Sequence, residues 1–131
     1  MSEEKIRVLI VEDSVDVREY LQRLIHYLAT DLEIVALASN GIQGIDLARE
    51  HQPDVVLMDI NMPDLDGIAA TQTLLQESPL SKVILMSGHV EPEYVKRSMQ
   101  AGAHQLITKP INGDELISII RTICKVDAGA N

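Results

Sequence analysis

Short apolar runs alternate with longer segments of helical periodicity along the 131 residues of the chain. The apolar runs are rich in β-branched residues, as is typical of strands buried on both faces of a parallel sheet. Strands are expected at 6–11, 33–39, 55–58, 82–87 and 104–108, and helices at 16–28, 42–52, 67–76, 91–101 and 114–125. Fivefold strand–helix alternation predicts an α/β fold, with a parallel sheet, right-handed crossovers and helices on both faces.

The length of the chain fits one domain. Hydrophobic residues make up 46% and charged residues 24%, and without Phe or Trp the core must consist of aliphatic residues and Met. The periodic pattern stops shortly after Lys125. A domain is therefore expected over residues 1–126, with 127–131 as a tail or the start of a linker.

Charge and composition exclude several classes of protein. The net charge of −9 and the lack of a basic run argue against direct binding to nucleic acid. No apolar stretch approaches the ~20 residues of a membrane span, and the first residues, M-S-E-E-K, lack the features of a secretion signal. The single Cys124 excludes an internal disulfide and fits a reducing compartment. A cytoplasmic location without membrane attachment is expected.

Polar residues lie at the ends of four of the expected strands. Glu12 and Asp13 come after the first strand, Asp59 after the third and Lys109 after the fifth, and Ser87 is the last residue of the fourth. In a parallel sheet the carboxyl ends of the strands meet at one edge, where ligand sites lie. With the strand order 2-1-3-4-5, the crevice would fall between the strands that end in the three carboxylates.

This set of side chains suits phosphoryl chemistry. Three converging carboxylates repel one another, and a divalent cation relieves that repulsion; an all-oxygen set favours Mg²⁺. Lys109 and Ser87 could contact a phosphoryl group, and a carboxylate such as Asp59 can form an aspartyl phosphate. Taken singly, each residue also has a structural interpretation as a turn, cap or exposed loop residue. Their occurrence together at successive strand ends favours the functional interpretation.

The chain resembles the receiver domain of two-component response regulators from Ile6 to about Lys125. The resemblance is carried by the motifs V-L-I-V-E-D, D-I-N-M-P-D-L-D-G, I-L-M-S-G and A-G-A-H-Q-L-I-T-K-P. It implies a flavodoxin-like, doubly wound (βα)5 domain with a five-stranded parallel sheet. It also implies a phosphorylation-dependent switch that assists its own phosphorylation without being an independent enzyme.

The resemblance implies roles for the strand-end residues. Asp59 would accept a phosphoryl group from a sensor histidine kinase or a phosphotransfer protein. Glu12, Asp13 and Asp59 would bind Mg²⁺ together with the backbone carbonyl of Asn61.

Further roles are implied for residues near the fourth and fifth strands. Ser87 and Lys109 would contact the phosphoryl oxygens, and the peptide bond before Pro110 would be cis. Ser87 and position 106 would form the switch, relaying the signal through the fourth helix, fifth strand and fifth helix to an output domain or partner. The family usually carries an aromatic residue where this chain has Leu106, which leaves the aromatic part of the switch open.

Self-association is a further expectation of the resemblance. A homodimer could form on phosphorylation. One common dimerising subfamily carries an arginine where this chain has Ile119, so that particular mode is not supported.

Three other functions share features with this pattern. A flavodoxin-like redox domain would need a Ser/Thr- and Gly-rich loop after the first strand, whereas Glu12 and Asp13 would repel a flavin phosphate. An aspartyl phosphohydrolase would need a general acid two residues after Asp13, where Val15 stands. An interaction module independent of phosphorylation is kept open by Leu106.

Overall fold

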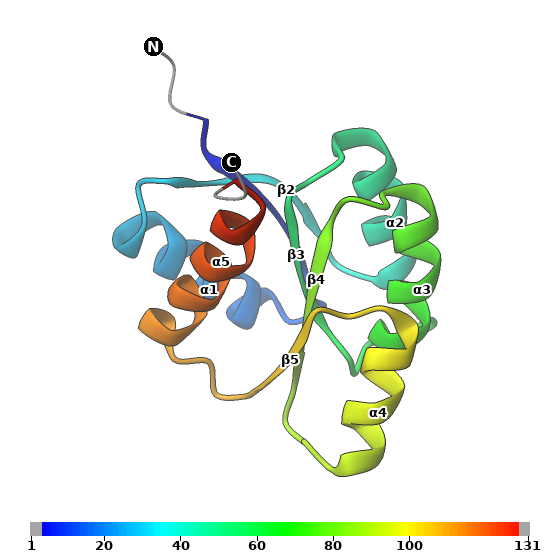
Figure 1. Ribbon diagram of the computed structural model, residues 1–131. Helices are drawn as coiled ribbons and strands as arrows, with labels where there is room; N and C mark the ends of the chain where they lie inside the picture. Colours follow the sequence, from blue (N-terminus) through cyan, green and yellow to red (C-terminus); the bar gives the residue numbers. More distant parts are fainter. Residues whose placement is uncertain (1–3, 129–131) are drawn as a thin grey trace.

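The computed structural model describes residues 4–128, which form a five-stranded parallel sheet between two layers of helices (Figure 1). The strand order is β2-β1-β3-β4-β5, and every neighbouring pair is parallel. The strands are β1 Ile6–Val11, β2 Leu32–Ala38, β3 Val55–Asp59, β4 Lys82–Ser87 and β5 Gln105–Thr108. The helices are α1 Val15–Leu28, α2 Gly41–His51, α3 Gly67–Glu77, α4 Pro92–Ala101 and α5 Gly113–Ala128. The flavodoxin-like topology expected from the sequence is confirmed.

The sheet separates two hydrophobic cores. Successive side chains of a strand point to opposite faces, so Val8 and Ile10 of β1 pack with α1 and α5, while Leu9 and Val11 pack on the other side. Figure 1 shows α1 and α5 over one face and α2, α3 and α4 over the other. All five residues of β3 are buried, which explains why the four residues before Asp59 are all apolar.

Short polar residues define where the helices begin. The Ser14 side chain accepts a hydrogen bond from the N–H of Val17 at 3.3 Å and caps α1. Asn40 and Asp66 cap α2 and α3 in the same way. Gly102 ends α4 in the left-handed conformation, with φ of 105°.

Two expectations about the helices differ from the structure. Helix α5 extends through Ala128, so residues 127 and 128 of the expected tail are helical, and residues 129–131 lie outside the described part. The helical spacing of apolar residues in 91–101 predicts that Val95 and Met99 face the core, but they are 38% and 42% exposed. Helix α4 instead packs through Tyr94, Ser98 and Ala101, which lie along a different side of the helix.

Within residues 4–128, no helix is both long and apolar enough to cross a membrane.

Gly67 allows the loop after β3 to fold back on itself. Its N–H donates to the carbonyl of Ile60 at 2.8 Å. A Cβ at this position would overlap the carbonyl oxygen of Asp59 and lie 2.8 Å from the Cα of Ile60. Both obstacles are backbone atoms and cannot rotate away, so the start of α3 lies directly against the end of β3 only because residue 67 has no side chain.

Replacing Gly67 with alanine should therefore destabilise the fold. We expect Gly67→Ala to lower the free energy of unfolding by roughly 1–3 kcal/mol, the usual cost of overpacking, measured by urea denaturation. Gly88→Ala is the matched control because a Cβ at Gly88 has nothing within 4 Å and the backbone there is not left-handed. The control should change stability by less than about 0.5 kcal/mol. Equal stabilities of the two variants would contradict the close approach at Gly67.

Candidate functional site

The carboxylates of Glu12, Asp13 and Asp59 come together at the carboxyl ends of β1 and β3. These strands are neighbours, and the pairing of Val11 with Met58 brings the residues that follow side by side. One potential ligand atom from each carboxylate lies within 4.8 Å of the other two. Glu12 is 1% exposed and Asp59 is 4% exposed, whereas Asp13 is exposed. The clustering expected from the sequence is thus present in the fold.

Lys109 reaches this cluster from the end of β5. Its Nζ lies 3.2 Å from Oδ1 of Asp59 and 3.3 Å from Oε1 of Glu12. The backbone N–H of Lys109 donates to the carbonyl of Ser87 at 2.8 Å, and the Lys109–Pro110 peptide bond is cis. One ammonium group therefore bridges two buried carboxylates that belong to different strands.

Ser87 and Asn61 lie next to the carboxylate cluster in the fold. Ser87 ends β4, the neighbour of β3, and is 1% exposed. Its Oγ accepts a hydrogen bond from the backbone N–H of His89 at 3.0 Å. The backbone N–H of Asn61 donates to Oδ1 of Asp59 at 3.3 Å, which holds the chain after β3 close to the carboxylate.

The burial of the cluster shifts the pKa of two of its members. Burial raises the pKa of Glu12; a hydrogen bond from the N–H of Ser14 lowers it, and the charge of Asp59 raises it again. For Lys109, burial lowers the pKa, but the charges of Asp59 and Glu12 raise it more, and the pKa ends above its usual value. Lys109 is therefore charged at neutral pH. One positive charge against three carboxylates leaves an excess of negative charge, which favours a cation.

The sequence pattern does not predict one contact to the loop between β1 and α1. The helical period of residues 16–28 predicts that Arg18 lies on the polar side of α1, opposite the apolar residues. In the structure its guanidinium Nη1 donates to the backbone carbonyl of Glu12 at 2.7 Å, and so braces the turn between β1 and α1. The position of Arg18 in the second turn of α1 is compatible with this contact. Whether the guanidinium reaches the Glu12 carbonyl depends on the path of the loop, which the sequence does not show.

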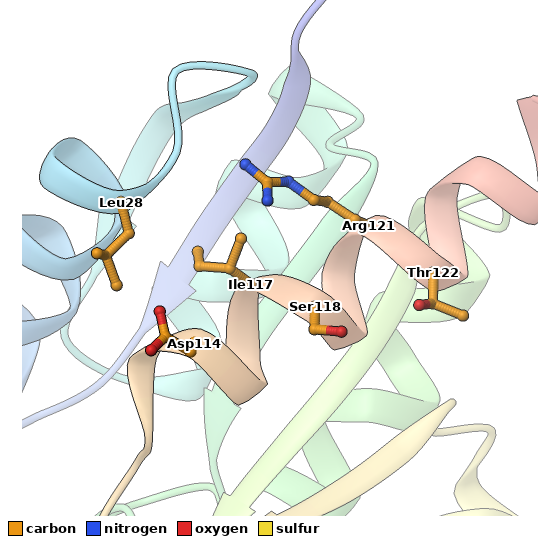
Figure 2. A pocket seen from close by; sticks show the side chains of 6 residues that line it. All are labelled: Leu28, Asp114, Ile117, Ser118, Arg121 and Thr122. Carbon is orange, nitrogen blue, oxygen red and sulfur yellow. The ribbon is translucent and has the colours of Figure 1, made fainter.

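A separate hollow of about 260 Å³ lies between α1 and α5 (Figure 2). Leu28 of α1 and Ile117 of α5 supply its apolar lining, and Asp114 and Arg121 supply charged groups. Arg121 also forms a bidentate ion pair with Asp31 at 2.8 and 2.9 Å. No residue of the carboxylate cluster lines this hollow, so it is not part of that site.

Removing the ammonium of Lys109 should leave Glu12 and Asp59 buried without compensation. We expect Lys109→Met to lower the free energy of unfolding at neutral pH by about 1–3 kcal/mol. This is less than the 3–5 kcal/mol of a fully buried ion pair, because the Lys109 side chain is 27% exposed. Lys96→Met, at an exposed position of α4, is the matched control and should have little effect.

The loss in Lys109→Met should also depend on pH. Without the ammonium, the pKa of Glu12 rises further, so the folded state binds a proton more tightly than the unfolded chain. The loss of stability is therefore complete at pH values above the pKa of Glu12 in the folded protein. It disappears as the pH falls toward 4.5, the ordinary pKa of a glutamate side chain. Urea denaturation at about pH 7.5 and about pH 5 should show a smaller deficit at the lower pH. A deficit that grows on acidification would contradict this electrostatic account.

Comparison with known proteins agrees with this geometry. The family model for the response regulator receiver domain matches residues 8–121. The chain is 33% identical to the transcriptional regulatory protein DegU of Brevibacillus brevis over 125 residues, which cover 95% of this chain and 52% of DegU. It is 35% identical to the chemotaxis protein CheY of Bacillus subtilis over 114 residues, covering 87% of this chain and 93% of CheY. The chain thus spans about half of one relative and nearly all of the other.

Solved structures show the same fold. The signal receiver domain of the response regulator NarL from Mycobacterium tuberculosis superposes with a TM-score of 0.87 at 30% identity, covering 93% of this chain and 98% of that one. The response regulator domain of CheB from Thermotoga maritima superposes with a TM-score of 0.82 at 34% identity, covering 91% of this chain and 96% of that one. All five strands described within residues 4–128 belong to one sheet. The chain belongs to the response regulator receiver domain family.

Proposed function

We propose that Asp59 accepts a phosphoryl group from the phosphohistidine of a sensor histidine kinase or a phosphotransfer protein. The observation that carries this proposal is the position of Asp59, buried at the end of the central strand with the Lys109 ammonium 3.2 Å away. A carboxylate oxygen attacks the phosphorus, the P–N bond breaks, and its electron pair returns to the imidazole nitrogen of the donor. The ammonium offsets negative charge on the group in transfer.

The carboxylate cluster fits a magnesium ion. Its donor atoms are all oxygen, they lie within 4.8 Å of one another, and their charge exceeds that of Lys109. We assign Glu12, Asp13 and Asp59 as ligands, with the backbone carbonyl of Asn61. A bound Mg²⁺ would neutralise charge on the phosphoryl oxygens and bring them close to Asp59.

We further propose that Ser87 begins the switch. The Ser87 hydroxyl accepts from His89 and keeps its own hydrogen to donate to a phosphoryl oxygen. Movement of Ser87 toward Asp59 would then draw the following loop and α4 with it. Leu106, on β5, is partly buried in the same core as Tyr94 of α4 and needs no large rearrangement. The output would be a change in the face formed by α4, β5 and α5, read by an output domain or partner.

Substitution of Asp59 tests the acceptor assignment. Asp59→Asn should abolish stable phosphorylation by acetyl phosphate in the presence of Mg²⁺, because the amide cannot form the acyl phosphate, and circular dichroism should show an intact fold. Asp64→Asn is the matched control, since Asp64 is exposed in the same loop and asparagine tolerates its positive φ of 71°. If Asp59→Asn is labelled as fast as the wild type, the assignment is wrong.

Magnesium should stabilise the domain by relieving repulsion within the cluster. At 100 times its dissociation constant, Mg²⁺ should add roughly 2.7 kcal/mol to the free energy of unfolding, visible as a higher melting temperature. Asp13→Asn should reduce this gain and stabilise the metal-free protein, whereas Asp16→Asn, at an exposed position three residues along, should keep the gain. Thermal melts that do not respond to millimolar Mg²⁺ would count against the site.

A further inference from the structure

Ser98 on α4 is a buried hydroxyl without a hydrogen-bond partner. Its side chain is 0% exposed, and it is the buried residue of α4. Within the described part of the chain, its Oγ is the one buried side-chain oxygen or nitrogen that lacks a partner. A buried polar group that loses water without gaining a bond raises the free energy of the arrangement that buries it.

The other buried hydroxyls show how the fold normally treats such groups. Thr71 of α3 donates to the carbonyl of Gly67 one turn earlier, at 2.7 Å. Ser78 and Ser81 bond to each other at 2.6 Å, and Ser87 accepts from the N–H of His89. Ser98 lies in a helix, as Thr71 does, but makes no comparable bond. Its unpaired state therefore stands out within a well-satisfied core.

Two other features of α4 also indicate that its observed position is only weakly stabilised. Val95 and Met99 are 38% and 42% exposed, so the helix buries a serine while it leaves two large apolar side chains in contact with water. Its first residue is preceded by Glu91, which makes no side-chain capping bond, unlike the caps of α1, α2 and α3. The observed position of α4, beside α3 in the outer layer (Figure 1), is therefore weakly favoured.

We propose that Ser98 is a positioning residue that lowers the cost of moving α4 when Asp59 is phosphorylated. The inference rests on the proposed function of Asp59. In the resting arrangement the hydroxyl of Ser98 is desolvated and unpaired; once α4 moves, it can bond to water or to a carbonyl. The free-energy cost of the unpaired hydroxyl falls on the resting state alone. It shifts the equilibrium between the two positions of α4 toward the moved state by roughly tenfold. A phosphoryl group then needs less binding energy to complete the shift.

Ser98→Ala tests this role because it removes the hydroxyl and little else. The variant should unfold at a higher urea concentration than the wild type, because its resting state no longer buries an unpaired hydroxyl. Its affinity for beryllofluoride in saturating Mg²⁺, measured by titration calorimetry, should fall roughly tenfold. Amide chemical-shift changes at residues 88–101 on adding beryllofluoride should also be smaller. Ser118→Ala is the matched control, because Ser118 is an exposed serine within a helix (Figure 2) and should leave the affinity unchanged.

The outcomes separate this inference from the proposed function. If Ser98→Ala binds beryllofluoride as tightly as the wild type, the residue has a purely structural role and the inference is overturned, while Asp59 keeps its assignment. The same holds if Ser98→Ala is no more stable than Ser118→Ala. If the wild type itself binds no beryllofluoride, the proposed function and this inference fail together.

Discussion

The site depends on two buried carboxylates that share one ammonium group. Glu12 and Asp59 are nearly inaccessible because the central strands that carry them end side by side within the sheet. Burial and the charge of Asp59 disfavour the charged form of Glu12, and Lys109 compensates only part of that cost. With the exposed Asp13 nearby, the negative charge remains in excess. This imbalance is the physical reason that a cation, followed by a phosphoryl group, suits the cluster.

The end of β3 and helix α4 differ in how tightly the surrounding structure holds them. Strand β3 is buried along its whole length, and the loop that follows it is held by the close approach of Gly67 to the backbone of Asp59. These constraints keep the Asp59 carboxylate in place. Helix α4 has the opposite character, with exposed Val95 and an unpaired Ser98. In the proposed function, chemistry that requires fixed distances and a response that requires displacement would therefore be carried by different elements.

The sequence predicts the sheet and the site well because both follow from the order of elements. A parallel sheet brings strand ends to one edge, so Glu12, Asp59 and Lys109 could be placed together before any distance was known. The orientation of α4 could not be predicted. Its apolar residues cover one broad sector of the helix, with Val95 and Met99 along one edge and Tyr94 and Ala101 along the other, so the pattern does not show which edge is buried. Tertiary packing determines which side of α4 is buried, and that side carries Ser98.

We propose that the connection between these two parts passes through Ser87. Asp59 pairs with Met86 across the β3–β4 ladder, so the next residue of β4 is adjacent to the end of β3. The Ser87 oxygen accepts from the N–H of His89, and a hydroxyl can accept and donate at the same time. Ser87 can thus contact a phosphoryl oxygen while it keeps its hold on the loop. A shift of Ser87 would carry His89 along, and α4 begins only three residues later, at Pro92. We infer that a short, hydrogen-bonded segment transmits the charge at Asp59 to the helix that is least firmly held.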